Sequence, residues 1–169
     1  VVNRVQTSAY SVGYAGMDSI MAATSEAVKG EDSCLVKPVR MINKAGKVVD
    51  ANIDTVLATL RSKGPEILDS PQCPGLGFCA DTMDDFDPLS WPMTTLTWFV
   101  IPLVSGPEHD CSKMKLVQDY AKWVLTSETA KDIATEKLFS TMPTQISARL
   151  VMEVEKMTCN GELLSTSNI

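Results

Sequence analysis

Apolar residues recur at helical spacing in a stretch of the chain that begins near residue 50. They stand at positions i, i+3, i+4 and i+7, at Ile53, Val56, Leu57 and Leu60. This spacing puts all four side chains on one face, which predicts an amphipathic helix. Asp50 or Asn52 can cap the start of this helix. Gly64-Pro65 is expected to close its end.

Three more helices are predicted in the last third of the chain. Ser112 can cap the first, whose apolar face is formed by Leu116, Val117, Tyr120, Trp123 and Val124. Ser127 can cap the second, whose inward-facing residues are predicted to be Ala130, Ile133 and Ala134. Pro143 suits the first turn of the third. Asn160-Gly161 is expected to stop this third helix, along which apolar residues recur at Ile146, Leu150, Val154 and Met157.

Two stretches of small, β-branched or aromatic residues are predicted to be buried strands. Residues 12–15 stand among glycines, which permit close backbone approach, and are expected to form a short buried strand. A short helix over residues 17–28 follows, ending near Gly30. The run 94–104 lacks strict alternation of apolar and polar residues, which predicts a central strand covered on both faces.

A hairpin-like element is predicted before the first clear helix. Residues 39–42 form its first strand, 43–46 its turn, and 47–49 continue extended. Residues 63–92 are rich in proline and acidic residues and are expected to form a long irregular crossing segment.

The amino-acid composition is typical of a globular protein that can bury a core. Hydrophobic residues make up 44% and charged residues 21% of the 169 residues. The net charge of −6 and the absence of a basic stripe argue against nucleic acid as a partner. The longest apolar run is interrupted by Pro102 and is too short to cross a bilayer. The amino end lacks the pattern of a signal peptide, and we expect the chain to be a fragment.

No catalytic, cofactor or metal motif is found. The lone His109 lies far from any serine motif of hydrolases, and glycine-rich nucleotide-binding loops are absent. We therefore expect neither an enzyme nor a cofactor. Zinc is not expected, since no C-x-x-C occurs. The acidic run Asp81, Asp84, Asp85 and Asp87 could hold calcium, but its spacing favours a solvated loop.

Several motifs, in their order along the chain, carry a resemblance to a known family. Residues 11–14 read SVGY, residues 42–46 read INKAG, residues 91–93 read WPM, and a pair of cysteines occurs late in the chain. The order resembles the carboxy-terminal half of bacterial phosphate-binding proteins, and is closest to the phosphate-binding-like ectodomains of eukaryotic microbes. The similarity extends over most of residues 5–161.

The resemblance implies an α/β fold of the type II periplasmic-binding-protein class, in which two lobes joined by crossing strands close over an oxyanion. Residues 1–90 would belong to the second lobe and residues 91–169 to the first. The family's phosphate ligands come mainly from the part before the SVGY strand, so none is assigned here. We expect this missing half, or another chain, to cover the exposed sheet edges.

Four residues are candidates for the cleft or hinge: Ser11, Tyr14, Thr94 and Thr95. Ser11 and Tyr14 stand where a cleft-facing strand would end, although the favoured interpretation of Tyr14 is a core residue. Thr94 and Thr95 follow Trp91 at the predicted crossing between the lobes. For these two residues we favour a role in the hinge over contact with the ligand.

Five cysteines favour an oxidising, extracellular location. Cys111 begins one helix and Cys159 follows another, and packed helices can bring such ends together. We predict a Cys111–Cys159 disulfide, with two buried thiols as the alternative. Cys73–Cys79, which encloses a short Pro/Gly-rich loop, is predicted as a second bridge. These two bridges use four of the five cysteines, so Cys34 is the candidate for a thiol that is free or paired outside the chain.

Two functions follow as expectations. The first is an extracellular module that binds phosphate or a similar oxyanion once the other half is present. The second is a structural or adhesive cell-surface module that has the same fold and no ligand.

Overall fold

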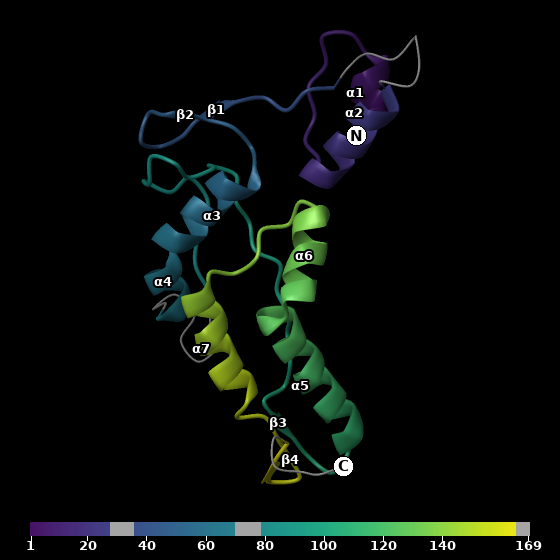
Figure 1. The fold of residues 1–169 in the computed structure, drawn as a ribbon, viewed down its shortest axis with the longest axis vertical. Coiled ribbons are helices and arrows are strands. Elements are labelled where there is room, and N and C mark those ends of the chain that lie inside the picture. Colours follow the sequence, from purple (N-terminus) through teal and green to yellow (C-terminus); the bar gives the residue numbers. More distant parts are fainter. Residues whose placement is uncertain (28–35, 70–78, 165–169) are drawn as a thin grey trace.

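The chain is a mixed helix-and-strand protein. A computed structural model describes residues 1–27, 36–69 and 79–164. In chain order, the elements in this part are α1 (Val2–Thr7), α2 (Met17–Ala27), β1 (Met41–Ile42), β2 (Val48–Val49), α3 (Ile53–Ser62), α4 (Gly64–Leu68), β3 (Val104–Ser105), α5 (Cys111–Thr126), α6 (Glu128–Glu136), α7 (Thr144–Val154), β4 (Thr158–Cys159) and β5 (Glu162–Leu163). Figure 1 shows α1 and α2 apart from the other helices, connected to them by the stretch that leads into β1.

The predicted hairpin is confirmed. Strands β1 and β2 pair antiparallel, with Met41 opposite Val49 and Ile42 opposite Val48. The turn between them closes with Gly46, whose φ of 74° lies in the left-handed region that glycine adopts without a steric penalty.

Helix α3 forms where its apolar spacing predicts it. Of the two candidate caps, Asn52 is the one used: its side chain accepts a hydrogen bond from Thr55 N at 2.9 Å. The Thr55 hydroxyl accepts one in return from Asn52 N, which completes a capping box. The helix ends at Ser62, but Pro65 then lies in the first turn of α4. The segment from residue 63 is therefore less irregular than predicted.

Helices α5, α6 and α7 confirm the three predicted late helices, with two corrections at their ends. Asp110, not Ser112, caps α5, because its carboxylate accepts from the amides of Ser112 and Lys113. Ser127 caps α6 as predicted. Helix α7 stops at Val154, before Asn160-Gly161.

Asn160 and Gly161 instead form the turn of a second hairpin. Both have positive φ, 53° and 84°, as the central residues of a type I′ turn require. The turn joins β4 to β5, and β4 also pairs in parallel with β3. A hairpin therefore occupies the place where the sequence predicts the end of a helix.

The two predicted buried strands are not found. Residues 12–15 are coil, and Tyr14 is 81% exposed, so a core role for Tyr14 is wrong. Within 94–104 only Val104 belongs to a strand, and Val100 is 96% exposed. A strand requires a neighbour for its backbone groups. Among the described residues, none forms a backbone–backbone hydrogen bond with residues 95–102.

Most of the buried apolar residues in the described ranges form two clusters, and α7 contributes to both. Leu60, Ile67 and Ile146 make one cluster, which joins α3 and α4 to the start of α7. The second cluster joins the end of α7 to α5 and the β4–β5 hairpin, through Met114, Val154, Met157, Cys159 and Leu164. Helix α7 therefore packs against α3 and α4 through the first cluster and against α5 through the second.

Helix positions alone did not predict which faces are buried. Met114 and Gln118 are the buried residues of α5, whereas Leu116 on its apolar face is 69% exposed. Ile133 of α6, predicted to face inward, is also exposed. The reason is that α7 packs against the side of α5 that carries Met114 and Gln118.

The predicted Cys111–Cys159 disulfide is present, with the two Cα atoms 5.7 Å apart. It joins the first residue of α5 to β4. Cys79 is also disulfide-bonded, but Cys73 lies outside the described residues, as does Cys34. None of the helices in the described ranges has the length and apolar character needed to span a membrane.

Candidate functional site

A large groove runs between the amino-terminal segment, the coil residues 94–101, and helices α5 and α6. We call it the central groove; its volume is about 1460 Å³. All four sequence-predicted site residues line it: Ser11, Tyr14, Thr94 and Thr95. The fold thus brings together two segments that lie about 80 residues apart in the sequence.

The lining of the central groove is mainly apolar and aromatic. Trp98, Phe99 and Tyr120 lie along it, and the rings of Phe99 and Tyr120 meet edge to face at 6.2 Å. The charged side chains among its lining residues are Lys37, Asp54 and Lys131, and Lys131 forms an ion pair with Glu128. Small oxyanions bind tightly where several donors converge. The described lining offers few charged donors.

Ser11 and Tyr14 differ in how their polar groups are used. The Ser11 hydroxyl donates to the backbone carbonyl of Ser8 at 2.7 Å, which stabilises the turn after α1. Tyr14, exposed at the groove, has its ring accessible. Tyr14 is therefore the better placed of the two to meet a ligand.

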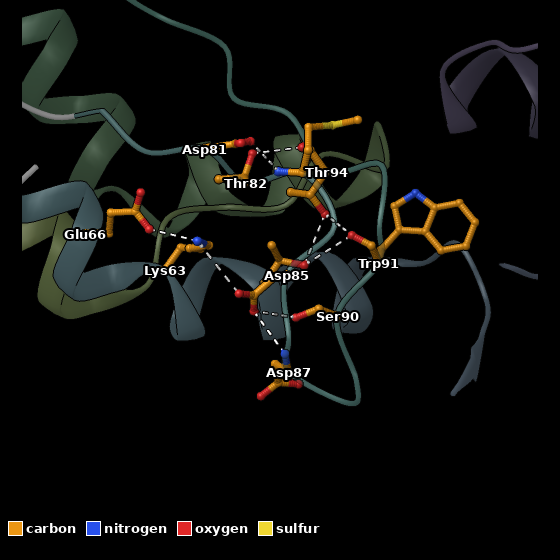
Figure 2. Close-up of polar contacts among 11 residues, drawn as sticks. Lys63, Glu66, Asp81, Thr82, Asp85, Asp87, Ser90, Trp91 and Thr94 are labelled. Atoms are coloured by element: carbon orange, nitrogen blue, oxygen red, sulfur yellow. Dashed lines mark hydrogen bonds and ion pairs between the residues drawn. The ribbon is translucent and has the colours of Figure 1, made fainter. Parts of the chain in front are cut away.

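Thr94 and Thr95 have opposite environments. Thr94 is 2% exposed, and its hydroxyl lies 2.9 Å from the carbonyl of Trp91 and 3.2 Å from the hydroxyl of Thr59. The Thr94 carbonyl accepts from the hydroxyl of Thr82 at 2.8 Å (Figure 2). Thr95, the next residue, is exposed. Thr94 fastens the segment to α3, and Thr95 begins the part that leaves it.

An ion-pair network, in which Asp85 is buried and Lys63 and Glu66 are partly exposed, holds the loop before Thr94 against α3 and α4 (Figure 2). Lys63 Nζ lies 2.8 Å from Glu66 Oε2 and 3.9 Å from Asp85 Oδ1. Asp85 Oδ2 accepts from the Ser90 hydroxyl at 3.2 Å. The hydrogen bond to Glu66 raises the pKa of Lys63. The network therefore ties the loop to the junction between α3 and α4.

Asp85 is a correction to the prediction of a solvated acidic loop. Its residue is only 7% exposed. Burial by itself raises the pKa of Asp85, but hydrogen bonds from Ser62, from nearby backbone amides and from Ser90 outweigh it and leave the pKa below its usual value. The carboxylates of Asp81 and Asp87 accept backbone amides two residues on and shape the loop.

In the described part of the chain, no three His, Cys, Asp or Glu side chains lie together in a way that could hold a metal ion. The network partner Lys63 and the buried Thr59 were missed from the sequence. Lys63 stands directly before Gly64-Pro65 and carries no motif. Thr59 is distinguished only by its place beside Leu60 on the inner face of α3.

Comparisons with known proteins find only distant similarity. No protein-family model matches the chain, and no solved structure matches it. Two Acanthamoeba polyphaga mimivirus proteins, named as the serine/threonine-protein kinase/receptors R826 and R818, are similar to it. R826 is 25% identical over 128 residues, which is 76% of this chain and 7% of that protein. R818 is 23% identical over 138 residues, 78% of this chain and 8% of that protein. The similarity covers most of this chain and a small part of each relative.

Proposed function

We propose that the chain is the carboxy-terminal half of an extracellular module that binds phosphate or a similar small oxyanion between two lobes. The proposed fold is of the type II periplasmic-binding-protein class, with residues 1–90 in one lobe and 91–169 in the other. The observation that supports it is the convergence of Ser11, Tyr14, Thr94 and Thr95 on the central groove. Ligand sites commonly lie in such a groove between parts of a fold.

The proposed partner is the polypeptide that supplies the other half of the module. Residues 95–102 are coil and form no backbone–backbone hydrogen bond with the described chain, and Val100 within this stretch is exposed. Exposed edges and apolar faces of this kind are usually covered in a stable protein. The scarcity of charged donors in the described groove fits the same proposal, since the missing half would bring the phosphate ligands.

An extracellular or secreted location is proposed on the same basis. The Cys111–Cys159 bridge supports it, because disulfides persist mainly in oxidising compartments. The names of the two mimivirus relatives, which include the word receptor, fit a module that senses a solute outside the cell.

The second candidate function is a structural or adhesive module with the same fold and no ligand. The mainly apolar lining of the central groove favours it, because a surface of this kind suits packing against protein. The two candidates differ in one measurable property, the binding of an anion.

Calorimetric titration of the complete two-lobed protein with sodium phosphate tests the proposal. A binding module gives saturable heat, and a scaffold gives none. Tyr14→Phe and Thr95→Val each remove one hydroxyl from the groove and should weaken binding about 10- to 100-fold, the value of one hydrogen bond to a charged group. Thr126→Val is the matched control, because Thr126 is exposed at the end of α5 and does not line the groove. Absence of heat with the unmodified protein would support the structural function instead.

A further inference from the structure

We draw no further inference here: the strongest candidate, the exposed apolar face that residues 98–104 share with the outer side of α5, adjoins the central groove already described, and nothing in the described residues shows what covers it.

Discussion

The side-chain amide of Asn43 donates a hydrogen bond of 3.2 Å to the backbone carbonyl of Ser90, 47 residues further along the chain. The same amide lies 3.0 Å from the carbonyl of Pro88 and 3.3 Å from that of Asp87. Its oxygen accepts from Lys47 N at 3.0 Å. One buried side chain therefore fastens the β1–β2 turn to the loop that leads to Trp91 and Thr94.

Asn43→Asp should lower the free energy of unfolding by about 1–3 kcal/mol, because it leaves three carbonyls without their donor and puts a carboxylate beside them. Urea unfolding monitored by circular dichroism measures the change. Ala45→Ser, at an exposed position of the same turn, is the control and should change stability by less than about 0.5 kcal/mol. Equal stability of the two variants would contradict the anchoring role of Asn43.

Asp85 should make stability depend on pH in the acidic range. Its pKa in the folded protein is lower than in the unfolded chain, so its contribution is present above the unfolded value, near 4, and is lost as the pH falls through the folded value. Asp85→Asn should reduce stability at pH 7 and flatten the decline below pH 4.

Urea unfolding at pH 7, 5 and 3 provides the measurement for Asp85. Asp84→Asn is the matched control, because Asp84 is an exposed neighbour in the same loop. If both variants show the acid profile of the unmodified protein, the carboxylate of Asp85 does not stabilise the fold.

The disulfide should contribute strongly to stability. Cys111 and Cys159 are separated by 48 residues, and closing a loop of that length stabilises a protein by about 4 kcal/mol in the chain-entropy model. The double variant Cys111→Ala/Cys159→Ala should therefore unfold at a clearly lower urea concentration. Peptide mapping of the native protein under non-reducing conditions should recover the two cysteines as one linked pair. An alkylatable Cys111 in that protein would overturn the bridge and weaken the proposed location.

Thr59 and Thr94 should be energetically coupled through their hydroxyls, which lie 3.2 Å apart in a buried site. Thr59→Val and Thr94→Val should each destabilise the protein by about 0.5–1.5 kcal/mol, because each removes buried hydrogen bonds, while the remaining hydroxyl keeps a bond to a backbone carbonyl. The double variant should lose less than the sum of the two, by about 0.5 kcal/mol or more. Strict additivity in this cycle would show that the hydroxyls do not interact.

Thr95→Val tests whether Thr95 serves the proposed anion binding, in contrast to its neighbour Thr94, which anchors the segment to α3. Because Thr95 is exposed, its substitution should leave urea unfolding almost unchanged while it weakens the anion binding proposed for the complete protein. A variant that loses stability but keeps full affinity would assign Thr95 to the anchor instead of the groove.

The isolated chain should associate with itself and bind a hydrophobic dye. Val100 and Leu116 are examples of large apolar residues that are exposed near the extended segment and α5. Analytical ultracentrifugation and dye fluorescence provide the measurements, with the chain joined to its proposed other half as the control. A monomer that unfolds cooperatively and does not bind the dye would show that this face needs no cover.

The sequence by itself determined the elements whose stability is local. Helix α3 follows from apolar spacing and a nearby cap, and Ser127 caps α6 as predicted. The β1–β2 turn follows from Asn43 and Gly46. Each of these elements depends on hydrogen bonds between residues only a few positions apart. Such local bonds can be predicted from the pattern of neighbouring residues. The Cys111–Cys159 pairing was predicted for a different reason, since both cysteines were expected near the ends of packed helices, although Cys159 lies in β4.

Only the tertiary structure decided which segments pair and which polar groups are buried. The run 94–104 has the composition of a central strand, yet strand pairing needs a neighbour, and the described chain provides one only at Val104 and Ser105. Asp85 is buried because Lys63 and Ser90, from different parts of the chain, satisfy its carboxylate. Likewise, only the tertiary fold makes Tyr14 and the segment that starts at Thr94 line the same central groove. Such contacts join residues distant in the sequence, so no local pattern predicts them.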